Sequence, residues 1–213
     1  MDAHGRLRLD AIARFLQDVA IDDVQETGWG IPEHLWFVRR IKIDVLTPFL
    51  EDREVRLTTW CSGVAAIAAG RRWSVTGDAG GRIEVDSVWI HLDAHANPAR
   101  IEDFGVYAEA AAGRPVSTKL ALPDPPADAE RLAWPLRASD VDLHGHVNNA
   151  VYWQAVEELL PRLAIDPRSA LQAELDYRRP IDLGESIELA AFDSGVAFLA
   201  NGSDVRAVAR VGR

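Results

Sequence analysis

Ser62-Gly63-Val64-Ala65 recurs without a change as Ser194-Gly195-Val196-Ala197, at a spacing of 194 − 62 = 132 residues. The same spacing relates further identical or similar pairs: Asp44 and Asp176, Pro48 and Pro180, Val55 and Ile187. Nearer the amino terminus, Asp2-Ala3-His4-Gly5 recurs as Asp142-Leu143-His144-Gly145, at a spacing of 142 − 2 = 140. One short match arises by chance, but several matches in order at one spacing indicate a structural unit that is written twice.

Each copy has the same order of elements: a polar turn, an amphipathic helix and a run of strands. In the first copy the helix ends near Gly28 and is indicated by the stripe Leu9, Ile12, Leu16, Val19 and Val24. In the second copy Pro161 ends the stripe Val151, Tyr152, Ala155, Val156, Leu159 and Leu160. Alternating apolar and polar residues predict strands over 41–45 and 55–59, and a hairpin loop at 78–81 predicts a returning strand over 82–92. Asn201-Gly202 is typical of a hairpin turn in the second copy. These patterns predict an α+β fold, an antiparallel sheet with its helices on one face.

The boundaries of the two copies follow from the proline-rich stretch Leu122-Pro123-Asp124-Pro125-Pro126-Ala127-Asp128, which is typical of an extended linker. We expect a first domain at 1–118, a linker at 119–130 and a second domain at 131–213. Residues 131–137 predict a strand that leads into the second motif. The first motif begins directly after Met1, so we expect the first copy to lack this leading strand and the true start to lie upstream.

Composition bounds the classes of function. The chain has 213 residues, 48% of them hydrophobic, and a formal net charge of −10, which argues against general nucleic-acid binding. No apolar run is long enough for a membrane span, the amino terminus lacks a signal-peptide pattern, and Cys61 is the single cysteine. We therefore expect a cytoplasmic protein without nucleic-acid or membrane partners. The oligomeric state stays open, with a homodimer as one alternative.

An anionic partner would require a local basic patch on so acidic a chain. Three groups of basic residues are candidates, although each is also typical of a solvated strand face: Arg39, Arg40 and Lys42; Arg71 and Arg72; Arg178 and Arg179.

The densest polar cluster is Asp142-Leu143-His144-Gly145-His146-Val147-Asn148-Asn149, directly before the second helix. Gly145 permits a sharp turn, and Asn148 or Asn149 can cap the helix. A carboxylate, two imidazoles and free N–H groups at a helix start provide a base for water and a site for an oxyanion. The same residues could also form only a well-bonded turn and cap. The first copy favours the functional interpretation, because it keeps Asp2, His4 and Gly5 but has Arg6 where His146 stands.

Other chemistries find less support in the sequence. His144 and His146 have the spacing of metal ligands, but Gly145 breaks the strand between them and no nearby carboxylate or cysteine completes a set. Cys61 lies in a strand pattern, which predicts an inert cysteine. The chain has no serine nucleophile elbow. We therefore expect neither a metal nor another cofactor.

Residues 142–149 followed by Ala150-Val151-Tyr152-Trp153 resemble the signature of the acyl-ACP thioesterases and of the wider hotdog thioesterase superfamily. Five further stretches resemble motifs of this family in the same order: 14–20, Leu35-Trp36-Phe37-Val38, Thr58-Thr59-Trp60, Arg71-Arg72-Trp73 and Ser87-Val88-Trp89. The resemblance spans nearly the whole chain. It implies two tandem hotdog repeats, each an antiparallel sheet wrapped on a long helix, and hydrolysis of a fatty acyl thioester of acyl carrier protein.

The chain departs from the family's catalytic pattern, which is Asp-x-Asn-x-His with a later Glu or Cys after an Arg-Arg pair. Asp142 and His146 match, His144 replaces the Asn, and Pro180 follows Arg178-Arg179. The resemblance thus leaves the detailed mechanism open and excludes a cysteine nucleophile at position 180.

Our hypothesis is that Asp142 and His146 together activate water while His144 orients water or substrate. The N–H groups near Val147 and Asn148, beside Asn149, would bind the oxyanion. Glu158 is an alternate base, and Gln17 on the first helix could reach across the interface between the copies, although a helix-face glutamine is more often solvated. Two alternatives keep the fold: an acyl-CoA thioesterase and a non-catalytic protein that binds acyl thioesters. A hotdog hydratase follows by fold analogy alone.

Overall fold

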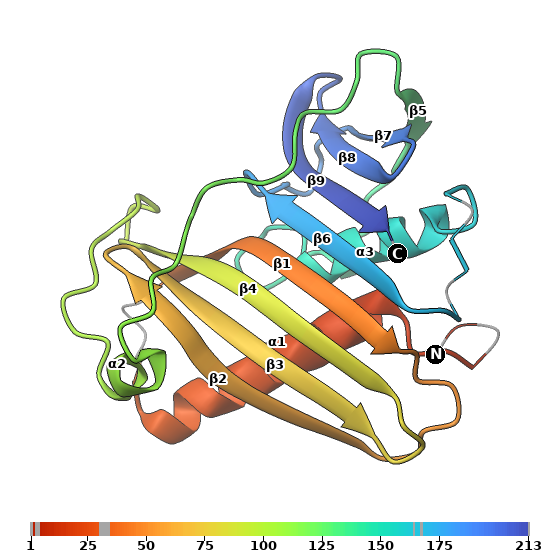
Figure 1. The fold of residues 1–213 in the computed structure, drawn as a ribbon. Helices are drawn as coiled ribbons and strands as arrows, with labels where there is room; N and C mark the ends of the chain where they lie inside the picture. Colours follow the sequence, from red (N-terminus) through yellow and green to blue (C-terminus); the bar gives the residue numbers. More distant parts are fainter. Residues whose placement is uncertain (1, 3–4, 30–34, 164, 167, 213) are drawn as a thin grey trace.

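The computed structural model describes residues 2, 5–29, 35–163, 165–166 and 168–212. Within them the chain forms one antiparallel sheet of nine strands, in the order β2-β3-β4-β1-β6-β9-β8-β7-β5 (Figure 1). The first half supplies β1 (Leu35–Thr47), β2 (Val55–Ala65), β3 (Ala68–Gly77) and β4 (Arg82–Leu92). The second half supplies β5 (Glu130–Ala133), β6 (Leu171–Tyr177), β7 (Ile187–Phe192), β8 (Gly195–Ala200) and β9 (Asp204–Gly212). The predicted α+β class is confirmed, as are the strand over 82–92 and the turn at Asn201-Gly202.

Two helices, α1 (Leu9–Thr27) and α3 (Asn149–Leu159), lie on the same face of this sheet (Figure 1). Gly28 ends α1 in the left-handed conformation, at φ 64°, as predicted from the stripe of apolar residues. The apolar stripes of both helices pack on the sheet and form one continuous core with its inward-facing side chains. A short helix α2 (Val106–Ala111) covers β2 at the edge of the sheet. No helix among the described residues is long and apolar enough to span a bilayer.

The two halves meet where β1 pairs with β6. Lys42 lies directly opposite Glu174, and 174 − 42 = 132, so each residue faces its own counterpart in the sequence repeat. On either side the pairing is symmetric, with Arg40 opposite Asp176 and Asp44 opposite Gln172. The register of this strand pair is therefore symmetric about Lys42 and Glu174.

The polar turns before the two helices share their backbone hydrogen bonds. Asp2 N–H donates to the Arg6 carbonyl at 2.8 Å, and Asp142 N–H donates to the His146 carbonyl at 2.9 Å. Next in the chain, Leu7 N–H donates to the Phe49 carbonyl at 3.1 Å, and Val147 N–H donates to the Ile181 carbonyl at 2.8 Å. Asp2, Arg6 and Leu7 correspond to Asp142, His146 and Val147 at the offset of 140, and Phe49 corresponds to Ile181 at the offset of 132. His4 lies outside the described residues, and Asp2 with residues 5–8 forms no strand.

The segment that joins the halves crosses the outer face of the sheet and is anchored there (Figure 1). Asp176, which is fully buried, accepts the Ala121 and Leu122 N–H groups at 2.8 Å each. Its other oxygen accepts Arg40 Nε at 2.7 Å. Because these bonds satisfy both oxygens of a buried carboxylate, the segment is held to the seam between the halves.

Candidate active site

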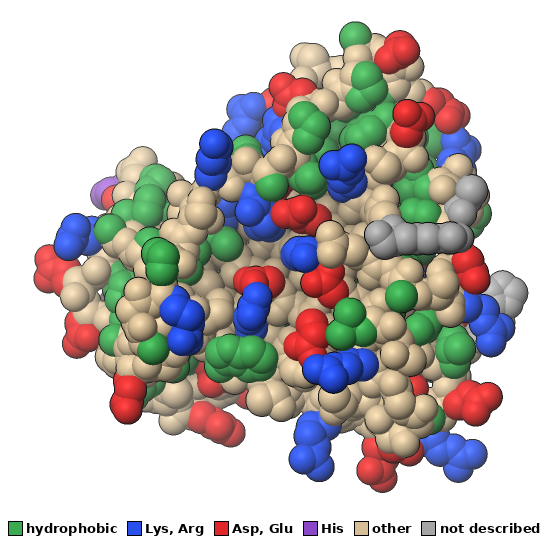
Figure 2. Space-filling model, viewed as in Figure 1, with side chains coloured by type: hydrophobic (Ala, Val, Ile, Leu, Met, Phe, Trp, Pro, Cys, Tyr) green, Lys and Arg blue, Asp and Glu red, His purple; other side chains and the backbone are tan. Residues whose placement is uncertain are grey.

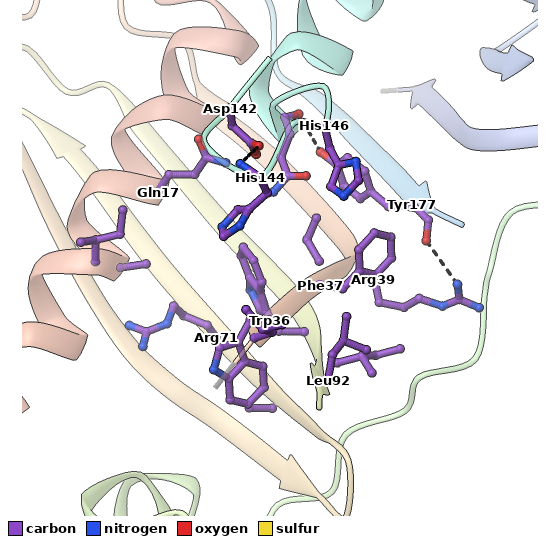
Figure 3. Close-up of a pocket in the computed structure, with 18 of the residues that line it drawn as sticks. Gln17, Trp36, Phe37, Arg39, Arg71, Leu92, Asp142, His144, His146 and Tyr177 are labelled. Atoms are coloured by element: carbon purple, nitrogen blue, oxygen red, sulfur yellow. Dashed lines mark hydrogen bonds between the residues drawn. The ribbon is translucent and has the colours of Figure 1, made fainter. Parts of the chain in front are cut away.

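A cavity of about 1020 Å³ contains nearly all of the residues that the sequence singled out. Its polar end is lined by Gln17 of α1 and by the motif residues Asp142, His144, His146, Val147, Asn148 and Asn149. Figure 3 shows His144 pointing into the cavity above Trp36, with Gln17 approaching the motif from α1. Glu158 does not line this cavity. The fold thus brings Gln17 of the first half to the same end of the cavity as the motif of the second half.

The turn of the motif uses the Asp142 carboxylate for its own geometry. Asp142 Oδ1 accepts the His144 N–H at 2.9 Å, and the Asp142 carbonyl accepts the Gly145 N–H at 3.1 Å. Gly145 has φ 82°, which a residue with a side chain adopts only at a cost. This bonding presents the His144 side chain to the cavity (Figure 3).

The carboxylate that pairs with His146 is Asp182. Its Oδ1 lies 2.6 Å from His146 Nδ1, and the two backbones form an isolated antiparallel bridge. Asp142, which we expected to activate water together with His146, lines the same cavity but uses its Oδ1 for the turn. With Nδ1–H donating to Asp182, Nε2 keeps its lone pair and can act as a base.

Sequence reasoning missed Asp182, although the repeat carries a signal for it. The first-copy counterpart of Asp182 is residue 182 − 132 = 50, which is Leu50, just as the counterpart of His146 is Arg6. The two residues of the pair are thus both specific to the second copy.

The start of α3 differs from the oxyanion site that we expected near Val147 and Asn148. Val147 N–H donates to the Ile181 carbonyl and Asn148 N–H to the Asp140 carbonyl, both at 2.8 Å, so neither is free to bind an oxyanion. Asn148 is the helix cap, its Oδ1 accepting the Ala150 N–H at 2.9 Å. The next N–H, that of Asn149, belongs to the first helical residue and has no partner within the helix. It is the group best suited to meet developing negative charge.

Two buried aromatic residues, Tyr177 and Trp153, hold the start of α3 in place through hydrogen bonds. Tyr177 donates its hydroxyl to the Asn149 carbonyl at 3.0 Å and accepts the Trp153 indole N–H at 3.1 Å. Burial raises the pKa of Tyr177 well above its ordinary value, so the hydroxyl stays a donor. The bonds fix the position of Asn149 relative to the sheet.

The repeat counterpart of Gln17 explains why Gln17 reaches the motif. Residue 17 + 140 is Glu157 of α3, and Glu157 contacts the turn of the first copy, while Gln17 lines the cavity beside the turn of the second. Its oxygens accept Arg6 Nη1 at 3.1 Å, Arg6 Nη2 at 2.5 Å and the Leu9 N–H at 2.5 Å. The position that carries His146 in one copy thus holds a buried ion pair in the other.

Glu158, the alternate base that we considered, is wrong for that role. Its side chain is exposed, whereas the neighbouring Glu157 faces inward. The apolar stripe fixed the face of α3 that packs on the sheet, but it did not decide which glutamate lies against the first-copy turn.

Replacing Glu157 by alanine is expected to lower the free energy of unfolding by about 3 kcal/mol, because it leaves the buried Arg6 with Asp2 as its remaining carboxylate. Glu158→Ala changes an exposed neighbour and should alter stability by about 0.5 kcal/mol or less. Urea denaturation of both variants measures the difference. Equal stabilities would show that the Arg6–Glu157 pair does not hold the two halves together.

Beyond the motif the cavity is mostly apolar. Its walls come from the second half of α1, the start of β1 and the end of β4, and include Ile21, Val24, Trp36, Phe37, Trp89, Ile90, Leu92 and Phe104. Cys61 also lines it but is buried, and burial raises the pKa of its thiol, as suits the inert cysteine that we predicted. Such walls suit an alkyl chain. Among the described residues, no three His, Cys, Asp or Glu side chains gather as metal ligands.

An antiparallel sheet with two helices on one face, and a cavity that joins an imidazole–carboxylate pair to apolar walls, are features of an acyl hydrolase. Family models identify which one. The acyl-ACP thioesterase N-terminal domain matches residues 1–104, and the acyl-ACP thioesterase C-terminal domain matches residues 124–203. The chain belongs to the acyl-ACP thioesterase family, and its activity is hydrolysis of fatty acyl thioesters.

Two individual relatives match over most of the chain. An uncharacterized protein of Mycobacterium tuberculosis is 32% identical, covering 100% of this chain and 87% of its own length. The oleoyl-acyl carrier protein thioesterase 2 of Arabidopsis thaliana is 26% identical over 80% of this chain, which spans 54% of that plant protein.

Solved structures share the fold. An acyl-ACP thioesterase of Bacteroides thetaiotaomicron has a TM-score of 0.79 at 19% identity, over 99% of this chain and 91% of that one. The 12:0-ACP thioesterase of Umbellularia californica has a TM-score of 0.79 at 18% identity, with the same coverage.

Proposed function

We propose that this thioesterase acts on fatty acyl chains carried by acyl carrier protein and that His146, paired with Asp182, is its general base. The observation that carries the proposal is the 2.6 Å contact between His146 Nδ1 and Asp182 Oδ1 at the edge of the cavity. It leaves Nε2 as a proton acceptor, and Asn149, whose N–H has no partner within the helix, lines the same cavity. The named carrier-protein relatives support the choice of carrier.

The reaction follows from this geometry. Nε2 of His146 takes a proton from water, and the water oxygen bonds to the thioester carbonyl carbon. The electron pair of the carbonyl moves to its oxygen, where the Asn149 N–H and the helix N-terminus stabilise the charge. The carbonyl then re-forms, the carbon–sulfur bond breaks, and the thiolate takes the proton from His146. A thiol pKa of about 8.5 makes this leaving group a good one.

The remaining polar residues of the cavity have orienting roles in this proposal. His144 and the Gln17 amide line the same end of the cavity and would hold the water or the thioester carbonyl in line with His146. Asp142 would shape the turn through its bond to the His144 N–H. The apolar walls beyond would hold the acyl chain.

The proposal includes the architecture that the resemblance implies: two tandem hotdog repeats at 1–118 and 131–213, joined at 119–130, in a cytoplasmic protein. The hydrogen bonds that recur at offsets of 140 and 132 support the repeat. The second helix has 11 residues against 19 in the first, so the repeat that keeps the catalytic motif has the shorter helix.

A thiol-release assay tests the function. We expect wild-type protein to hydrolyse acyl-carrier protein faster than the acyl-CoA of the same chain, across a series of chain lengths. Faster hydrolysis of acyl-CoA would assign the alternative carrier. Tight binding of acyl thioesters without thiol release would instead identify a non-catalytic binding protein and overturn the proposal.

A further inference from the structure

Arginines outnumber carboxylates among the residues that line the cavity, although the chain as a whole is acidic. Four arginines line it, Arg39, Arg71, Arg178 and Arg179, against two carboxylates, Asp18 and Asp142. The chain has a net charge of −10, and on the sheet face opposite α1 and α3 basic and acidic side chains are interspersed (Figure 2). Basic residues that gather in a cavity of an acidic protein favour an anionic ligand there.

Arg39 differs from the other basic residues that the sequence marked as candidates for an anionic partner. The other six each form an ion pair with a carboxylate: Arg40 with Asp176, Lys42 with Asp44, Arg71 with Asp23, Arg72 with Asp86, Arg178 with Asp124 and Arg179 with Asp204. Within the described part of the chain Arg39 has no carboxylate within ion-pair distance. Its Nη1 donates to the Tyr177 carbonyl at 3.3 Å and its Nε to the Thr118 carbonyl at 3.5 Å.

The backbone places this side chain at the rim of the cavity. β1 and β4 pair Val38 with Trp89 and Arg40 with Val88, so Arg39 is the extra residue of a β-bulge. A bulge re-aims a side chain and is common beside active sites. In Figure 3, Arg39 lies beside Tyr177 on the opposite side of the cavity from Gln17 and Arg71. Arg179 lines the cavity too and its side chain is 61% exposed, so the cavity is open to solvent near Arg179.

Neighbouring charges leave Arg39 available for a ligand. The nearby Asp176 is already bonded to Arg40 and to two backbone N–H groups. Burial lowers the pKa of Arg39; the Asp176 charge opposes this shift, and the like charges of Arg178 and Arg40 add to it, but a guanidinium stays charged at neutral pH. A partly buried cation with unused N–H donors gains most from an anion that accepts two hydrogen bonds.

We infer that Arg39 binds the phosphate of the phosphopantetheine arm that carries the acyl thioester. This inference rests on the proposed function, because the arm would run from the His146 end of the cavity to Arg39 at its rim. Acyl carrier protein and CoA both present a phosphate at this place on the arm. The planar guanidinium fork matches a phosphate and is held in place by the Tyr177 and Thr118 carbonyls.

The test compares acyl-phosphopantetheine with acyl-pantetheine, two thioesters of one acyl chain that differ only in the phosphate. Arg39→Gln should lower kcat/KM on acyl-phosphopantetheine, on acyl-CoA and on acyl-carrier protein by about tenfold. On acyl-pantetheine the loss should be about twofold or less. Arg39→Lys, which keeps the charge but not the fork, should recover part of the loss. Arg72→Gln, which removes an exposed, paired arginine outside the cavity, should behave like wild type on all four substrates.

Other results of this comparison would contradict the proposed role of Arg39. Equal losses on both thioesters would mean that Arg39 only braces the Tyr177 and Thr118 carbonyls, and no loss on either would remove it from the site. A loss confined to acyl-carrier protein would assign Arg39 to the protein surface of the carrier instead of the phosphate. If wild type hydrolyses none of the substrates, the proposed function fails, and calorimetry with phosphopantetheine alone still tests Arg39. Binding that is equal in wild type and Arg39→Gln would overturn the inference.

Discussion

His146→Ala is expected to reduce kcat for thioester hydrolysis by about 10³-fold, the range typical for loss of a general base. His146 carries the Nε2 that would accept the proton of water, and alanine offers no substitute. KM should change little, because in the proposed binding mode the acyl chain would contact the apolar walls of the cavity and not the imidazole. Thiol release from acyl-carrier protein, followed under saturating substrate, measures kcat directly.

Two controls separate catalysis from folding for His146→Ala. His95→Ala removes an exposed imidazole that does not line the cavity and should keep wild-type kcat. Thermal unfolding of His146→Ala should match wild type within a few degrees, since the His146 side chain is 44% exposed. A folded His146→Ala protein with full activity would remove His146 from the mechanism.

The sequence predicted most of the fold because the fold depends on local patterns. The stripe from Leu9 to Val24 gave α1 with its end at Gly28, and the loop at 78–81 gave the strand over 82–92. Both predictions rest on the spacing of residues within one element, and the repeat offers a second copy of each pattern for comparison. The seam of the sheet, where Lys42 meets Glu174, depends on long-range pairing that no local pattern determines.

The site was predicted in part for the same reason. Residues 142–149 are consecutive, so the turn and the Asn148 cap follow from their order along the chain. The partners of the motif come from elsewhere: Asp182 approaches His146, and the Ile181 carbonyl takes the Val147 N–H. Asp182 lies two residues after Pro180, and no local pattern in the sequence links it to His146. The repeat comparison, applied to every residue, would have singled out Asp182 opposite Leu50.

Asp182→Asn is expected to reduce kcat by about 10²-fold with little change in KM. Asparagine keeps the shape of the side chain but can offer an N–H to His146 Nδ1. That contact favours the tautomer with the proton on Nε2, which cannot act as a base. The neutral amide also no longer stabilises the imidazolium that forms during the reaction. Because the Asp182 side chain is 59% exposed, water screens this charge, and we expect a smaller loss than for a buried partner.

Asp142→Asn is the matched variant, because it makes the same chemical change at the carboxylate that we first paired with His146. An asparagine oxygen can still accept the His144 N–H, so the turn should persist and kcat should fall by about tenfold or less. The order of the two effects distinguishes the two carboxylates. A larger loss in Asp142→Asn than in Asp182→Asn would show that Asp142 is the catalytic carboxylate. The double variant Asp182→Asn with His146→Ala should then be no slower than His146→Ala alone if Asp182 acts through His146, because residues that act as a unit are not additive.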